Sequence, residues 1–145
     1  MKKAVFMGSV LLTLALAGCS AGGDLNGGAS SSSAPAGSPL SSDITITQPQ
    51  PGDTVVSPLT VTGEARGTWY FEASFPVRLL DGNGNELAVA PAQAQGDWMT
   101  EDFVPYAVTL TFIAPPTTTG TLVLEKDNPS GDPANAESVS IPVAF

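Results

Sequence analysis

Apolar and polar residues alternate with a period of two along most of the chain after Asp43. Successive side chains of a β-strand point to opposite faces, so this pattern places one set in a core and the other in water. The alternation recurs in seven short segments, with no run of helical period between them. Their apolar positions are Ile44 and Ile46; Leu59, Val61 and Gly63; Phe75, Val77 and Leu79; Leu87 and Val89; Tyr106, Val108, Leu110 and Phe112; Leu122 and Leu124; and Val139, Ile141, Val143 and Phe145.

Turn-forming residues separate these segments. The run from Asp81 to Asn85 reads DGNGN, which favours the positive φ angles of a tight hairpin. Pro76 and Pro142 lie inside strand-like runs, and proline cannot donate to a β-ladder, so we expect those strands to lie at edges or to be bulged there. The pattern predicts an all-β fold, an antiparallel β-sandwich of about seven strands over residues 43–145.

The N-terminal residues 1–18 follow a different pattern. Lys2 and Lys3 precede an apolar run that ends in small residues, which is typical of a secretory signal peptide. The run is shorter than the roughly 20 residues needed to cross a bilayer. Its ending, Leu16-Ala17-Gly18-Cys19, resembles the lipobox of bacterial lipoproteins. The resemblance implies cleavage before Cys19 and lipidation of its thiol, and Ser20 resembles an outer-membrane address in bacteria with two membranes.

Residues 19–42 are mainly serine, glycine, alanine and proline. Such a segment buries too little apolar surface to offset the entropy of ordering it, so it is predicted to be a flexible linker. The predicted organisation is therefore a lipoprotein signal peptide (1–18), a lipidated cysteine with its linker (19–42) and a β-domain (43–145). We expect a cell-envelope protein held at a membrane by its lipid anchor.

The chain is acidic, with 14 acidic and 5 basic residues and a net charge of −9. Removing the signal peptide also removes Lys2 and Lys3, which takes the net charge to −11. A chain of this charge repels phosphate backbones, so no nucleic-acid partner is expected. It also has no polybasic patch for anionic lipids, so the acyl chains must hold it at the membrane.

The residues that most often carry chemistry are scarce. Histidine is absent, and the single cysteine is assigned to the lipid, which excludes Ser-His-Asp and Cys-His catalysis and Cys/His zinc sites. We therefore expect no enzyme activity, no metal and no cofactor. A carboxylate-dependent hydrolase or carbohydrate-active enzyme remains an alternative, because paired acids alone can catalyse glycoside hydrolysis.

A calcium-dependent adhesion module is a second alternative, because oxygen ligands alternate between Asp81 and Asn85 as at the start of an EF-hand loop. That loop needs glycine where this chain has Glu86 and glutamate where it has Ala92. A hairpin turn accounts for the same residues and is the favoured interpretation.

Strand parity predicts which loops lie together. If each strand crosses the sandwich once, the loops at residues 65–72, 91–102 and 126–136 share one end. Both tryptophans of the chain lie in these loops, among several acids, and aromatic residues of this kind are enriched at binding surfaces. The candidate binding surface consists of Arg66, Trp69, Tyr70, Glu72, Asp97, Trp98, Met99, Glu101, Asp102, Asp127 and Asp132.

Two interpretations of this surface stay open. The loops could bind an envelope protein or a glycan, or Trp69 and Trp98 could cap the core while the acids are simply solvated. Because the first predicted strand also begins at this end, we expect these loops to face the linker and the membrane.

The predicted domain resembles a known family in its sequence. The stretches that carry the resemblance are Ile44-Thr45-Ile46, residues 56–65 (VSPLTVTGEA) and Phe71-Glu72-Ala73. They are similar to the immunoglobulin-like domain of bacterial spore germination proteins, a family associated with the GerMN domain. The resemblance implies an immunoglobulin-like β-sandwich at the cell envelope, with no catalytic residues to transfer onto this chain.

Overall fold

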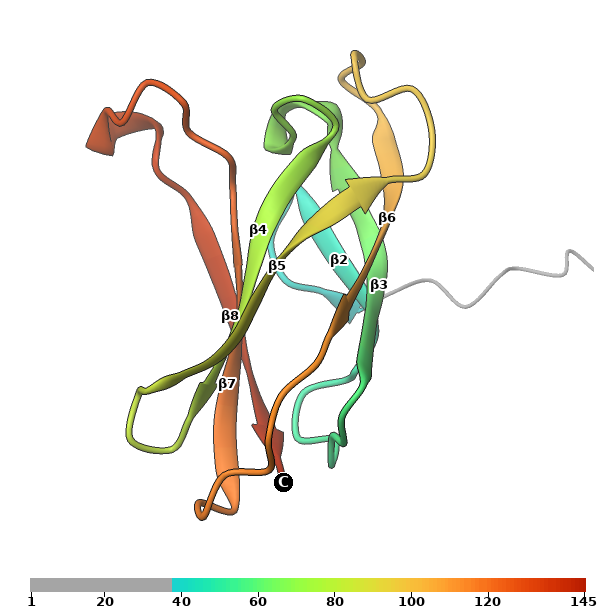
Figure 1. Cartoon of the computed structure of the whole chain (residues 1–145). Helices are drawn as coiled ribbons and strands as arrows, with labels where there is room; N and C mark the ends of the chain where they lie inside the picture. The colour runs from blue at the N-terminus through green and yellow to red at the C-terminus, as the bar shows by residue number, and fades with distance from the viewer. Residues whose placement is uncertain (1–37) are drawn as a thin grey trace, which may run out of the picture. The chain divides into compact units, whose positions relative to one another are not determined.

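The computed structural model describes residues 38–145, so the predicted signal peptide, Cys19 and most of the predicted linker lie outside the described residues. The described chain contains no α-helix, and no helix in it is long and apolar enough to cross a membrane. It forms eight strands and two short 3-10 segments (Figure 1). The strands are β1 (Ser38–Pro39), β2 (Ile44–Gln48), β3 (Leu59–Arg66), β4 (Ser74–Asp81), β5 (Glu86–Ala94), β6 (Phe103–Leu110), β7 (Thr119–Glu125) and β8 (Ser138–Ala144), and the 3-10 segments are η1 (Gly67–Trp69) and η2 (Pro133–Asn135).

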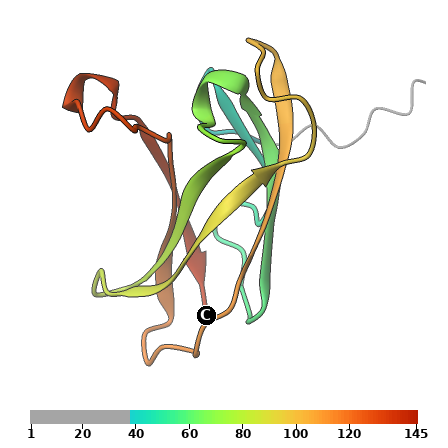
Figure 2. The same cartoon turned by 45° about the horizontal axis from the view of Figure 1, so that its top comes forward.

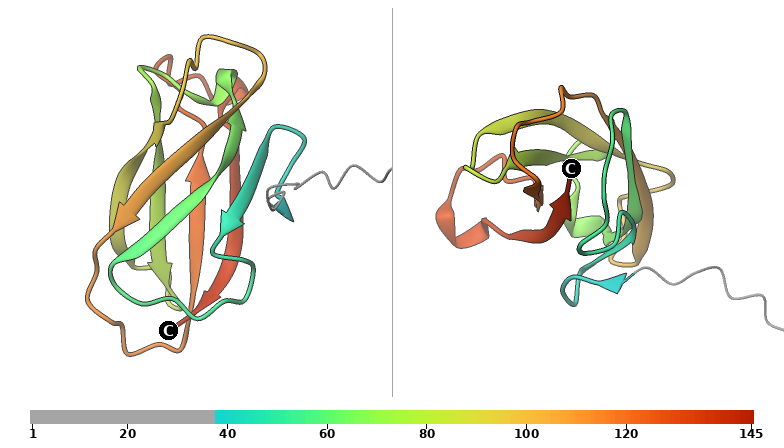
Figure 3. Two further views of the ribbon diagram at one scale, coloured as in Figure 1. Left: turned by 90° about the vertical axis from the view of Figure 1, so that its right-hand side faces the viewer. Right: turned by 90° about the horizontal axis from the view of Figure 1, so that it is seen from below.

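The strands form one antiparallel sheet in the order β1-β2-β3-β6-β5-β4-β7-β8. β5 pairs with β4 along its length but with β6 only at Gln93 and Ala94, so it crosses from one layer to the other (Figure 1). The sheet thereby curls into two facing layers joined along one edge, which Figure 3 shows from below. The predicted all-β antiparallel sandwich is confirmed, with seven longer strands and the two-residue β1.

The core fills the space between the two layers. Burial alternates along β3 and β4, where every second side chain faces inward. The largest fully buried side chains are Trp69, Tyr106 and Phe75, and the Phe75 and Tyr106 rings meet edge to face with 5.1 Å between centroids. The predicted alternation therefore identifies the core positions of most strands.

β5 departs from the prediction at Val89, which was expected to face the core. Val89 lies opposite Arg78 on the outer face and is 48% exposed, while Ala90 and Ala92 face inward. Pro76 lies opposite Pro91, and because neither has an N–H, this pair occupies a position without ladder hydrogen bonds. Because alanine side chains are small, they leave room for β5 to cross from one layer to the other.

The two prolines for which an edge or a bulge was predicted, Pro76 and Pro142, behave differently. Pro142 lies in β8, an edge strand as predicted. Pro76 lies in β4, a central strand between β5 and β7 whose register is regular at Pro76, so the prediction of an edge or a bulge there was wrong. The β4–β7 ladder starts only at Val77↔Leu124, one residue beyond Pro76, so its missing N–H leaves no ladder bond unmade on that side.

The last residues of the predicted linker join the sheet. Ser38 and Pro39 form β1, which pairs with β2 opposite Ile46 and Thr45. β1 runs antiparallel to β2, so Ser38 lies alongside Ile46, away from the end at which β2 begins. The first long strand, β2, begins where β3 ends, as predicted, because Ile44 lies opposite Ala65. That the loops at this end face the linker and the membrane stays a prediction.

Candidate functional site

The loops at residues 67–73, 95–102 and 126–137 lie at one end of the domain, which we call the apical end (top of Figure 1). The loops at 49–58, 82–85 and 111–118 lie at the other, the basal end. This arrangement agrees with the parity argument. Figure 2 shows that the loop carrying η2 stands apart from the other two apical loops.

Trp69 and Tyr70 close the apical end of the core. Their exposed fractions are 0% and 4%, and both rings pack edge to face on Phe75, at centroid distances of 5.9 and 5.2 Å. The Tyr70 hydroxyl donates to the carbonyl oxygen of Val104 at 2.7 Å, and burial raises the pKa of Tyr70. Trp69 therefore caps the core, as one of the two open interpretations has it for Trp69 and Trp98, and neither Trp69 nor Tyr70 is accessible to a partner.

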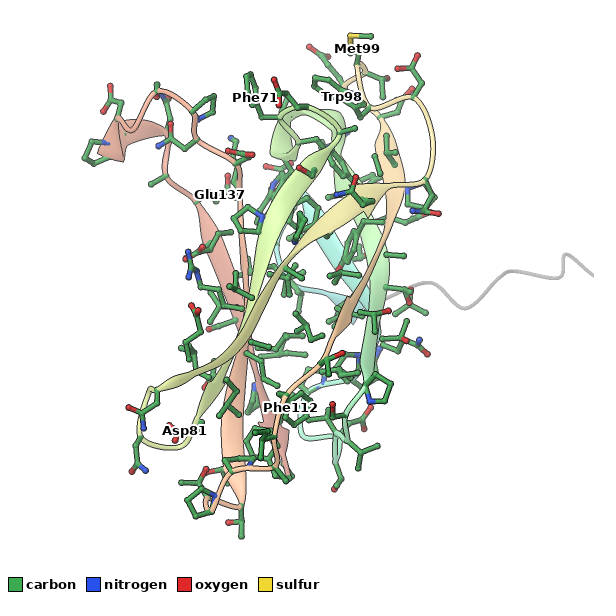
Figure 4. The ribbon with its side chains drawn as sticks, in the orientation of Figure 1. Phe71, Asp81, Trp98, Met99, Phe112 and Glu137 are labelled. Atoms are coloured by element: carbon green, nitrogen blue, oxygen red, sulfur yellow. The ribbon has the colours of Figure 1, made fainter. Side chains whose placement is uncertain are left out.

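The exposed apolar side chains of the apical end come from the 95–102 loop, from the loop before β4 and from the start of β6. Met99 is 77% exposed and forms the outermost point in Figure 4, with Trp98 on the same loop and Phe71 on the neighbouring loop. Trp98 is half-buried and packs on the core, while Phe71 and Phe103 are 43% and 37% exposed. Phe71 and Phe103 were missed in the sequence, although the outward position of Phe103 follows from the inward position of its neighbour Val104.

The 95–102 loop is packed directly on the backbone of η1. A Cβ atom added at Gly67 would lie 1.9 Å from the Thr100 carbonyl oxygen and 2.3 Å from that of Trp98, so only glycine fits. The Gly67 N–H donates to the Asp102 carbonyl oxygen at 3.1 Å. These contacts fix the backbone of the loop that carries Met99.

Arg66 contacts both the 95–102 loop and the residue that precedes β2. Its guanidinium donates to the Glu101 carbonyl oxygen at 2.9 Å and pairs with the Asp43 carboxylate at 3.2 Å. The same group lies over the Phe103 ring, 4.7 Å from the centroid. Three interactions therefore hold Arg66 in a structural position at the base of the loop.

The acids of the candidate surface fall into two groups. Glu72, Asp97, Glu101 and Asp102 are exposed on the loops that carry Phe71 and Met99, where the Asp97 carboxylate accepts the Met99 N–H at 3.0 Å. Asp127 and Asp132 belong to the third loop. The Asp127 N–H donates to the Trp69 carbonyl oxygen at 3.1 Å, and the Asp132 carboxylate accepts the Ala134 N–H at the start of η2.

Glu72 and Ala73 have an unusual backbone conformation. Their φ angles are +51° and +64°, and Phe71 and Ser74 exchange backbone hydrogen bonds across them at 3.0 and 3.1 Å. Two positive φ angles between a hydrogen-bonded pair define a tight turn that normally contains asparagine and glycine. The turn projects Phe71 outward at the cost of backbone strain.

The Asp81 run forms the tight hairpin that was predicted. Its carboxylate accepts hydrogen bonds from the Asn85 side chain and from the backbone N–H groups of Asn85 and Asn83, and Gly84 has a φ of +82°. These hydrogen bonds lower the pKa of Asp81, and the bond from the Asn85 side chain has the largest effect. Within residues 38–145, no group of three or more acids is placed to hold a metal ion.

Comparisons with known proteins identify the domain. Searches of curated proteins and of solved structures gave no match. Residues 43–132, more than half of the chain, match the family described as the immunoglobulin-like domain of bacterial spore germination (Gmad2). That family is typically non-catalytic and suggests a binding or structural module. The chain therefore belongs to the immunoglobulin-like domain family of bacterial spore germination.

Proposed function

We propose that this protein is a lipid-anchored component of the cell envelope whose immunoglobulin-like domain binds a partner protein through its apical end and is not an enzyme. The observation that carries the proposal is the exposure of Met99 and Phe71 on closely packed loops that also carry four exposed acids, Glu72, Asp97, Glu101 and Asp102. Protein-binding hot spots combine exposed apolar side chains with a fixed backbone, because little entropy is then lost on association.

A partner protein is favoured over a glycan by the shape and chemistry of the tip. Sugar-binding sites are concave and offer open aromatic faces, whereas the outermost side chain here is Met99 and Trp98 is half-buried. A hydrolase is disfavoured because a general acid needs a desolvated carboxyl, and the four acids around the tip are exposed.

The anchor is tested at Cys19. The Cys19→Ala variant should lose both acylation and cleavage at this site, because the thiol is the lipid acceptor in the lipobox that residues 16–19 resemble. Metabolic labelling with a fatty acid analogue, followed by mass spectrometry of the N-terminus, measures both. An acylated and normally cleaved variant would show that the anchor is elsewhere.

The binding end is tested by crosslinking in intact cells with the full chain. Met99→Ser should remove the specific adduct, while Ile113→Ser, at a basal position that is 89% exposed, should leave it unchanged. Both changes remove one exposed apolar side chain, so they are matched in chemistry. If Ile113→Ser removed the adduct and Met99→Ser did not, the binding surface would lie at the basal end. If the adduct contained a glycan and no protein, the proposal of a partner protein would be wrong.

A further inference from the structure

The basic side chains of the apical end already form ion pairs with acids of the same domain. Arg66 pairs with Asp43, and Lys126 pairs with Glu137 at 3.7 Å. Arg78, on the outer face of β4, pairs with Glu86 and Glu125. Every lysine and arginine of the described chain is therefore held in an ion pair, and none is left to neutralise further carboxylates.

The carboxylates around the Met99 tip have no such partner. Glu72, Asp97, Glu101 and Asp102 form no ion pair with any described residue, although all four lie on the two loops that carry the exposed apolar side chains. Exposed apolar side chains on loops whose exposed acids are all unpaired in the described chain match a protein interface in which charged residues at the rim select the partner.

The same charges exclude two other occupants. A second copy of this chain offers no unpaired cation in its described part, so an apical contact between copies would set acid against uncompensated acid. An anionic lipid surface would repel the rim in the same way.

We propose that the partner bound at the apical end is a protein surface with an apolar recess for Met99 and with lysine or arginine side chains around it. This inference rests on the proposed function and adds the chemistry of the partner to it. The rim carboxylates steer the partner into place, and the apolar tip provides the buried contact.

The experiment compares two variants that change the net charge equally. Glu72→Gln with Glu101→Gln neutralises two rim acids whose carboxylates make no hydrogen bond within residues 38–145. Asp53→Asn with Glu64→Gln neutralises two exposed acids away from the tip. The full chain, held in neutral phosphatidylcholine vesicles, is titrated with a dodecapeptide of alternating lysine and leucine. Binding to empty vesicles is subtracted, and a glutamate-leucine peptide and phosphatidylglycerol vesicles are the comparison probes.

We expect the rim variant to bind the lysine-leucine peptide about fivefold more weakly, and the control variant to change binding by less than about twofold. Added salt should weaken binding of the wild type more than that of the rim variant. The inference would be overturned if both variants lost the same affinity for the lysine-leucine peptide. It would also be overturned if the wild type bound the glutamate-leucine peptide or the phosphatidylglycerol vesicles as tightly as the lysine-leucine peptide. If Met99→Ser still removes the cellular adduct in that case, the proposed function stands without a basic partner.

Discussion

The two ends of the domain close the same core but differ in what they present outside it. At the apical end Trp69 and Tyr70 cover the core, and at the basal end the Phe112 and Phe145 rings do so, with 5.8 Å between centroids. Both ends expose apolar side chains, and Ile113 at the basal end is even more exposed than Met99. Exposure alone therefore does not identify a binding end.

Charge separates the two ends. The two loops of the apical tip carry four exposed acids that form no ion pair within residues 38–145, whereas the basal loops carry one, Asp53, and the loop with Ile113 carries none. Both ends have a fixed backbone: the apical 95–102 loop packs on Gly67, and the basal 49–58 loop donates the Val55 N–H to the Ala144 carbonyl oxygen at 2.9 Å. The number of unpaired acids is therefore what distinguishes the apical end.

The largest difference in stability is expected between alanine variants of the two apical tryptophans. Trp69→Ala should lower the free energy of unfolding by about 3–5 kcal/mol, because a fully buried aromatic leaves a cavity. Trp98→Ala should cost less than about 2 kcal/mol, because that side chain is only half-buried. Urea denaturation measures both values, and equal losses would contradict the assigned roles. Trp69→Phe should cost less than the alanine variant, since it also removes an indole N–H that has no hydrogen-bond partner among the described residues.

The packing of the apical loop on η1 is tested at glycine positions. Gly67→Ala should cost about 1–3 kcal/mol, because its Cβ would collide with two backbone carbonyl groups. Gly96→Ala is the matched control in the same loop, where the nearest atom to an added Cβ lies 3.9 Å away. The control should change stability by less than about 0.5 kcal/mol. Thermal unfolding of both variants checks the pair, and an unperturbed Gly67→Ala protein would contradict the close packing.

The tight turns at the two ends should respond with opposite signs. Ala73→Gly should stabilise the domain by about 1 kcal/mol, because glycine adopts a φ of +64° without strain. Gly84→Ala, in the basal hairpin with a φ of +82°, should destabilise it by a similar amount, about 1 kcal/mol. Urea midpoints measure both changes. A destabilised Ala73→Gly protein would show that the apical turn is not strained.

The basal hairpin should give the domain a small acid sensitivity. The pKa of Asp81 is lowered in the folded state, so its charged form stabilises the fold above the unfolded pKa of about 3.9. That contribution is lost as the pH falls through the folded pKa. The difference in free energy of unfolding between wild type and Asp81→Asn should be constant near neutral pH and shrink below about pH 4. A difference that grows toward acid pH would contradict the sign of the shift.

Much of the fold could be predicted because alternation is a local property of each strand. Ile44, Val61 and Phe75 all face the core as the pattern requires. The inward face of β5 could not be predicted, because Val89 is a stronger apolar signal than the alanines beside it. That strand takes its register from pairing with β4, including the Pro76↔Pro91 position, which is not visible in either segment alone.

The sequence predicted which end of the domain the candidate residues occupy, but not which of their side chains are buried. Parity placed Trp69 and Trp98 at one end, yet whether a loop tryptophan turns inward depends on the local path of the chain. The η1 segment turns Trp69 into the core, whereas the contact with Gly67 holds the Trp98 segment at the surface. Phe71 was missed because its exposure results from the positive φ angles of Glu72 and Ala73, which no residue preference at those positions predicts.

The central claim, that the apical end is the binding end, is tested most directly by hydroxyl-radical footprinting of the full chain in intact cells and after purification. Met99, 77% exposed, should be oxidised several-fold more slowly in cells, because a bound partner covers it, while Ile113 should react equally in both states. Protection of Ile113 with free reaction of Met99 would contradict the claim.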